Sequence, residues 1–250
     1  MSTRAFGVST HLFQHERLCR DHLLAIAAYG FEAVEVVAAA GHFEPSNDAA
    51  VADLQQWLAE ARLELHAVAA PPPDGPQPWS AGELGPVERA LHVARRIPLP
   101  VLVVPVGAPK SAAKAIDRLA TLAEPLGVTL AVDSRSPSMS PIGALVAFVE
   151  RCEAPIGIAL DFGTAGKGGA LVDAIELASE HLVAARLPPE SAIDWSAVMT
   201  TVQKVGYEGP FIIDVADSRP SAGRGGKAAA SALQLARTAR EKMERWLTSI

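Results

Sequence analysis

Residues 129–161 read TLAVDSRSPSMSPIGALVAFVERCEAPIGIALD. Two short apolar runs, 129–132 and 156–160, flank a longer apolar segment, 141–152, of helical length and period. Each run is rich in Val, Ile, Leu and Ala, which is typical of a strand buried on both faces. Each run is also followed by an aspartate, Asp133 or Asp161. The stretch therefore predicts a strand, a helix and a second, parallel strand.

The same alternation extends along the whole chain. Strands are predicted at 5–9, 33–37, 63–69, 101–106, 129–132, 156–160, 182–187 and 211–215. Helices are predicted at 16–29, 48–62, 83–96, 111–126, 141–152, 171–179, 195–205 and 227–248. Eight consecutive βα units indicate an α/β protein with a single (β/α)8 TIM barrel. We expect one domain, residues 1–250, with the proline-rich segment 71–78 as a loop at the barrel mouth.

Composition and charge argue against several classes of function. The 250 residues include 22 Lys and Arg against 28 Asp and Glu, a net charge of −6, without a long basic run, which argues against nucleic-acid binding. The uncharged stretches 97–109 and 136–149 are too short for a membrane crossing. The N-terminus does not resemble a secretory signal, and two cysteines are too few for a disulfide framework. We expect a cytoplasmic protein, either a monomer or an oligomer.

Four charged residues lie at the carboxyl ends of the last four predicted strands: Asp133, Asp161, Arg186 and Asp214. In a TIM barrel the chemistry is confined to this end of the strands. Because residues two apart share a face, small residues such as Ala131 should face the barrel axis together with the charged ones. The bulky neighbours should face the helices. The sequence thus predicts a ring of charge above a floor of small side chains.

The chain resembles the xylose-isomerase-like barrel family of sugar isomerases and epimerases, which also includes AP endonucleases. The resemblance spans nearly the whole chain, and its most specific segment leads into the last strand. The matching segments are FGVST (6–10), YGFEAVEV (29–36), LELHAVAAP (63–71), EPLGVTLAVD (124–133), GIALDFGTA (157–165) and IDWSAVMTTVQKVGYEGPFIID (193–214).

The resemblance implies one divalent metal at the barrel mouth. Such families bind it with a Glu, an Asp, a His and a Glu at the ends of strands five to eight, and the two Glu also exchange the substrate proton. The matching positions here are Asp133, Asp161, Arg186 and Asp214, so only Asp161 keeps the family's residue. A zinc cluster and a basic surface, as AP endonuclease action would need, are not visible in the sequence.

The acidic cluster needs a compensating cation. Three carboxylates about 5 Å apart would repel by roughly 3 kcal/mol per pair at an effective dielectric near 20. One candidate is Mg²⁺ or Mn²⁺, held by Asp133, Asp161 and Asp214. The other is Arg186, whose guanidinium can bridge two carboxylates. The shortened side chains at positions 133 and 214 favour the metal-free arrangement, and a third interpretation is that the acids only buttress the barrel mouth.

The leading hypothesis is a sugar or sugar phosphate isomerase or epimerase with a degenerate metal site. If it is active, Asp133 and Asp214 are the proton-transfer pair beside a substrate carbonyl, and Asp161 orients the metal or Arg186. The alternative is a non-catalytic barrel that binds a small ligand after losing the metal centre.

Further candidates for substrate binding lie elsewhere in the chain. Glu35 and His66, on strands two and three, are either pocket residues or satisfied structural ones. Arg219 and Lys227 flank a glycine-rich segment at the start of the last helix, in a region where barrels often bind phosphate. That segment is either an anion site for a phosphorylated or carboxylated ligand or a solvated loop. The expected partner is thus a small carbohydrate or anionic ligand.

Overall fold

The strands form a closed barrel of eight parallel strands in sequence order, as predicted. The computed structural model describes residues 5–70, 85–106, 109–136, 141–166, 170–189, 193–215 and 226–248. The strands are β1 (Phe6–Ser9), β2 (Ala33–Val37), β3 (Glu64–Ala69), β4 (Val101–Val104), β5 (Thr129–Asp133), β6 (Gly157–Asp161), β7 (Leu182–Leu187) and β8 (Phe211–Ile213). All eight predicted strands are confirmed; 33–37 and 182–187 match in full, and the ends of the others shift by at most two residues.

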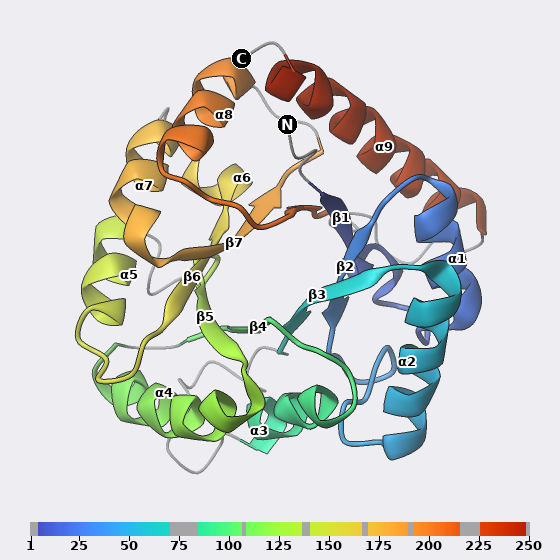
Figure 1. The fold of residues 1–250 in the computed structure, drawn as a ribbon, viewed down its shortest axis with the longest axis horizontal. Helices are drawn as coiled ribbons and strands as arrows, with labels where there is room; N and C mark the ends of the chain where they lie inside the picture. The colour runs from blue at the N-terminus through green and yellow to red at the C-terminus, as the bar shows by residue number, and fades with distance from the viewer. Residues whose placement is uncertain are drawn as a thin grey trace.

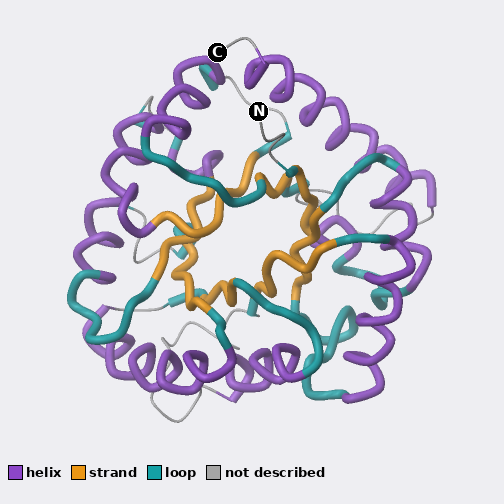
Figure 2. Tube along the Cα trace, in the orientation of Figure 1, coloured by secondary structure: helices purple, strands orange, loops and turns teal. Residues whose placement is uncertain are grey.

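The helices surround the barrel on its outside (Figures 1 and 2). They are α1 (Arg20–Ala28), α2 (Asp48–Ala61), α3 (Gly85–Ala90), α4 (Pro109–Ala123), α5 (Ile142–Val149), α6 (Phe162–Ala165), α7 (Leu171–Ala178), α8 (Trp195–Lys204) and α9 (Gly226–Thr248). Short 3-10 segments add η1 (Thr10–Phe13), η2 (Leu91–Arg95), η3 (Glu124–Leu126) and η5 (Ser179–His181). The eight predicted helices are present, whereas the four-residue α6 was not predicted.

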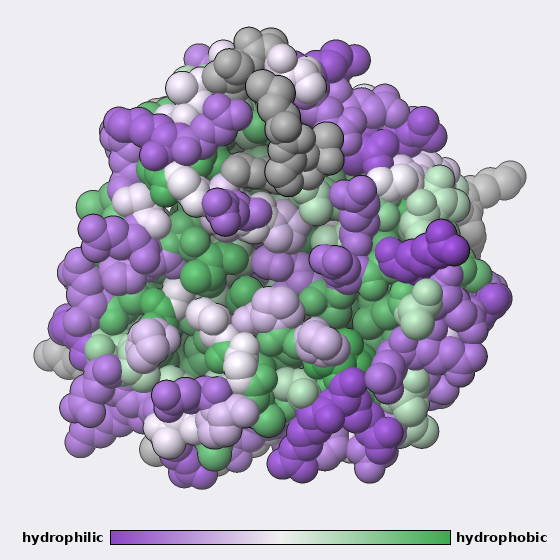
Figure 3. Space-filling model, viewed as in Figure 1, coloured by the Kyte–Doolittle hydropathy of each residue, from purple (hydrophilic) through white to green (hydrophobic). Residues whose placement is uncertain are grey.

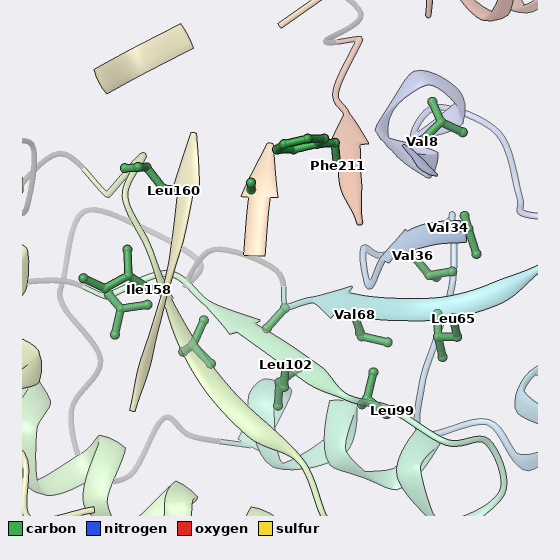
Figure 4. Packing of buried hydrophobic residues seen from close by; sticks show 14 of the residues in the cluster. Val8, Val34, Val36, Leu65, Val68, Leu99, Leu102, Ile158, Leu160 and Phe211 are labelled. Carbon is green, nitrogen blue, oxygen red and sulfur yellow. The ribbon is translucent and has the colours of Figure 1, made fainter. Parts of the chain in front are cut away.

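The strands separate small and bulky side chains onto two faces. The axial cluster contains Ala67, Ala69, Val101, Val103, Ala131, Ala159 and Ala184. The outward residues, including Leu130, Ile158 and Leu160, belong to the larger core between strands and helices. Figure 4 shows several of these buried side chains around the strands. Each fully buried Leu or Ile contributes about 1.5–3 kcal/mol, so this outer layer is the main source of stability.

Two register shifts alter the alternation. On β3, Leu65 pairs with Val34 and Ala67 with Glu35, which leaves His66 as an extra residue. On β7, Val183 is skipped in the same way and packs against the axial cluster, although it was expected to face the helices. A bulge inserts one residue into a strand and re-aims its side chain. The bulges therefore explain where simple alternation fails.

Local sequence signals agree with the fold. Gly30, Gly127 and Gly206 follow α1, η3 and α8, and all have positive φ, between 68° and 85°, which glycine adopts without a Cβ clash. In the view of Figure 3, hydrophilic residues dominate the periphery, where the helices lie, and hydrophobic ones are more frequent further in. Within the described ranges, no helix combines the length and the apolar character that spanning a membrane requires.

Candidate functional site

Arg186 lies at the centre of the charged cluster. It comes from β7, has 0% exposure, and its guanidinium contacts two carboxylates. Its Nε donates to Glu35 Oε2 at 2.8 Å, and its Nη1 donates to Asp133 Oδ2 at 3.0 Å. Its Nη2 lies 2.7 Å from Glu35 Oε2, an ion-pair contact outside hydrogen-bond geometry. Although burial lowers the pKa of Arg186, the two carboxylates outweigh it, and the pKa is raised.

A second arginine, Arg135, bridges Asp133 and Asp214. It follows β5 by two residues, and its backbone N–H donates to Asp133 Oδ1 at 2.9 Å, which turns the chain back over the carboxylate. Its Nη2 donates to Asp133 Oδ2 at 2.9 Å, and its Nη1 donates to Asp214 Oδ2 at 2.7 Å. Charge-assisted bonds of this length are among the strongest in proteins. Arg135 thus joins the two acids that the sequence proposed as the proton-transfer pair.

Two residues of the first βα unit close the chain of contacts into a ring, because the backbone N–H of His11 donates to Ser9 Oγ at 3.3 Å. His11 Nδ1 lies 3.1 Å from Asp214 Oδ1 and, facing a carboxylate, is the donor. Ser9 Oγ donates to Glu35 Oε1 at 3.0 Å. The seven-residue ring, hereafter the polar ring, consists of Ser9, His11, Glu35, Asp133, Arg135, Arg186 and Asp214. Within the polar ring, His11 and Arg135 have the most exposed charged side chains, 26% and 33%, and those of Asp133 and Asp214 are 9% and 7% exposed.

The arginines keep the carboxylates of the polar ring ionised. Burial raises the pKa of Asp133, but the charges of Arg186 and Arg135 outweigh it and lower the pKa to about 2. For Asp214, burial likewise raises the pKa, while the hydrogen bond from His11 and the charge of Arg135 bring it below its ordinary value. Both groups are therefore anions at neutral pH.

Asp161 is positioned differently from the expectation. Its Oδ1 accepts from the backbone N–H of Thr164 at 2.6 Å and caps the N-terminus of α6. The physical reason is local, because a helix that starts one residue after β6 needs an acceptor for its free N–H groups. The described acids that form hydrogen bonds with Arg186 are Glu35 and Asp133, and the role of Asp161 in orienting the metal or Arg186 stays a prediction.

The remaining candidates divide into two groups. Glu35 belongs to the polar ring, and His66 lies close enough to Glu35 and Arg186 for their charges to act on its pKa, which burial lowers. Arg219 lies outside the described residues, as does the side chain of Lys227. The predicted anion site therefore stays a prediction.

The polar ring does not fit a divalent metal. The oxygens of Asp133 and Asp214 already accept from guanidinium groups or from His11, and a metal among them would lie next to two fixed positive charges. Arg186 replaces the His that the resemblance implies. No group of three or more His, Cys, Asp or Glu side chains within the described ranges has an arrangement suited to a metal ion.

Arg135 and His11 were not among the predicted site residues, because the charged cluster was predicted from the ends of the strands. A usable signal existed for Arg135: a base two residues after a strand-ending acid, Asp133-Ser-Arg, can form the turn seen here. His11 has a weaker signal, since it lies two residues beyond β1 in the 3-10 segment η1.

The His11–Asp214 contact predicts a pH dependence of stability. The hydrogen bond to Asp214 raises the pKa of His11 above its ordinary value of 6.5, against burial and the charge of Arg135. A raised folded-state pKa stabilises the protein fully below about pH 6.5, and that stability is lost as pH rises through the raised pKa. His11→Asn, which cannot titrate, should therefore be less stable than wild type at pH 5 and approach it at pH 9.

Urea denaturation of both proteins at pH 5, 7 and 9 measures this difference. A difference that stays constant across the series would show that His11 is not protonated more readily in the folded state.

Comparisons with known proteins agree with the geometry of the barrel. Residues 23–247 match the family model described as xylose isomerase-like TIM barrel. No curated protein matches the chain by sequence.

Solved structures share the fold at low sequence identity. A D-psicose 3-epimerase determined in the presence of D-fructose has a TM-score of 0.80 at 16% identity, covering 97% of this chain and 99% of that one. An L-ribulose 3-epimerase has a TM-score of 0.79 at 16% identity, covering 98% and 95%. The IolI protein with a bound zinc atom has a TM-score of 0.75 at 13% identity, covering 98% of each chain.

At these identities the structural likeness shows the fold alone, whereas the family model covers most of the sequence. The chain therefore belongs to the xylose isomerase-like TIM barrel family.

Proposed function

We propose that this protein is a sugar isomerase or epimerase that moves a proton beside the carbonyl of a small carbohydrate without a divalent metal. The observation that carries the proposal is Arg135, which holds Asp133 and Asp214 together at the mouth and is itself one-third exposed. The family, and the ketose epimerases that share its fold, support the reaction class.

Proton abstraction beside a carbonyl needs a base within hydrogen-bond reach and a cation for the oxygen that becomes negative. In the proposed step the C–H bond breaks, its electrons form the enediolate, and the proton passes to Asp214. Arg135 stabilises the enediolate oxygen. In an isomerisation Asp214 returns the proton to the neighbouring carbon, and the hydroxyl proton moves between the two enediolate oxygens. In an epimerisation a proton from water reaches the opposite face of the same carbon, and Asp214 releases its proton to solvent.

Asp214 is better suited than Asp133 to accept the proton. Asp133 accepts from the backbone and guanidinium of Arg135 and from Arg186, whereas Asp214 has one described partner on each oxygen. Its lowered pKa keeps Asp214 ionised but also weakens it as a base. Stabilisation of the enediolate by Arg135 must therefore supply the larger part of the rate enhancement.

Deuterium exchange tests the reaction and its independence of metal together. The protein, treated with EDTA, is incubated in D2O with D-fructose, D-tagatose or L-ribulose, and proton NMR follows loss of the signals beside the carbonyl. We expect exchange that depends on the protein and is unchanged by EDTA. Exchange abolished by EDTA and restored by Mn²⁺ or Mg²⁺ would contradict the metal-free proposal.

The second candidate function is a non-catalytic barrel that binds a small ligand. It is favoured by one observation: every carboxylate of the polar ring is already ion-paired or hydrogen-bonded, which is also what a structural plug would show. Saturable binding of a ketose without any exchange would support this candidate over the enzyme.

A further inference from the structure

His66 is buried without a hydrogen-bond partner for one of its ring nitrogens. The residue is 8% exposed, and its Nε2 is out of reach of water and finds no partner in the described part of the chain. Leaving such a group unsatisfied is costly, because it loses its hydrogen bonds to water on folding and gains none in return. Native proteins tolerate few such groups, and each calls for an explanation.

His42 shows what a satisfied buried histidine looks like in the same barrel. It is 3% exposed, its Nδ1 lies 2.6 Å from the carbonyl oxygen of Glu16, and its Nε2 lies 3.0 Å from Thr10 Oγ1. Within the described ranges the fold thus provides partners for both ring nitrogens of His42 but none for Nε2 of His66.

The β-bulge on β3 is the reason why His66 is placed here. As the extra residue opposite Val34 and Glu35, it departs from regular alternation. It lies within electrostatic range of Glu35 and Arg186, two members of the polar ring. Bulges are frequent next to functional sites, where they re-aim a side chain.

We propose that His66 binds an uncharged hydroxyl group of a small carbohydrate through Nε2, at the base of the barrel mouth. The charges beside it are already paired, because Glu35 and Arg186 bond to each other. A carboxylate or phosphate would therefore meet Glu35 without a free cation to match it among the described ring residues. A hydroxyl can donate or accept, and it satisfies a neutral imidazole in either tautomer.

The low exposure of His66 sets a condition on binding. Because Nε2 is not accessible in the unliganded barrel, the ring must rotate or a neighbour must shift when the ligand enters. The choice of a carbohydrate as the ligand rests on the proposed function. The observation that Nε2 of His66 is buried without a hydrogen-bond partner in the described residues does not.

The test compares His66→Leu with His42→Leu, the same substitution at an unsatisfied and a satisfied site. Removing the unsatisfied group should raise the Tm of the unliganded protein by roughly 2–4 °C, whereas His42→Leu should lower Tm. Calorimetric titration with D-fructose and with sorbitol, which lacks the carbonyl, should show affinity reduced about fivefold or more in His66→Leu for both probes. His66→Gln, which keeps a donor and an acceptor, should recover part of the affinity.

Several results would overturn the inference. A fall in Tm for His66→Leu as large as that for His42→Leu would make His66 structural. Unchanged affinity in His66→Leu, or no saturable binding of either probe to wild type, would show that His66 does not bind a carbohydrate hydroxyl. Binding of D-fructose that depends on His66 without proton exchange would end the proposed function and leave this inference standing, and exchange with affinity independent of His66 would do the reverse.

Discussion

Replacing Arg186 with methionine is expected to lower the free energy of unfolding by about 3–5 kcal/mol, the usual cost of removing one partner of a buried ion pair. Glu35 and Asp133 would both lose the guanidinium that they share in a fully buried position. Methionine fills much of the volume, so the loss reflects unpaired charge more than a cavity. Urea denaturation at pH 7 measures the change.

The control is Arg237→Met on α9, which removes an exposed ion pair with Glu241. Exposed pairs of this kind contribute little, so its free energy of unfolding should stay close to that of wild type. If Arg186→Met were no more harmful than this control, the arginine would not be compensating the buried acids.

The same variant makes a second, independent prediction. In wild type the pKa of Asp133 is about 2, so its stabilising contribution is present above its ordinary pKa of 3.8 and lost as pH falls toward 2. Without Arg186 the carboxyl group of Asp133 should be protonated more readily. The stability difference between wild type and Arg186→Met should therefore narrow as pH falls below about 4, and a constant gap would contradict this assignment.

The barrel was predictable because its signals are periodic and repeated. Eight apolar runs alternate with eight helical segments, and a closed parallel barrel buries all of them. The small residues Ala131, Ala159 and Ala184 face the axis as alternation requires. The alternation of side chains along a strand could not predict the bulges at His66 and Val183. The register of a strand depends on its neighbour as well as on its own sequence.

The site was predictable only in part, because loops decide which side chains pair with each charged residue. Arg186 was expected to bridge carboxylates, and it does, but with Glu35 and Asp133. Asp161 was assigned from its place at a strand end, whereas the short helix α6 behind it takes up its carboxylate. Arg135 reaches Asp214 from a loop whose turn geometry decides the direction of the side chain. The end of a strand therefore predicts where a charged residue lies, but not which side chain it pairs with.

The largest expected effect on activity is that of Asp214→Asn. The substitution keeps the size of the side chain but removes the proposed proton acceptor, so deuterium exchange of the responsive ketose should slow by about 10²- to 10⁴-fold. Arg135 keeps its contacts with Asp133, and the site should retain its shape. Ketose affinity, measured by calorimetry, should change far less than the exchange rate.

Asp161→Asn separates this mechanism from one that uses a metal. Asparagine also caps helices well, so α6 should keep its N-terminus, and the polar ring does not include Asp161. If guanidinium groups supply the positive charge, exchange in Asp161→Asn should remain within a few-fold of wild type. If a divalent ion is required, Asp161 is the one position that matches the family's ligand set, and its loss should be as severe as that of Asp214. Equal loss in both variants would therefore favour a metal mechanism over the arginine-based one.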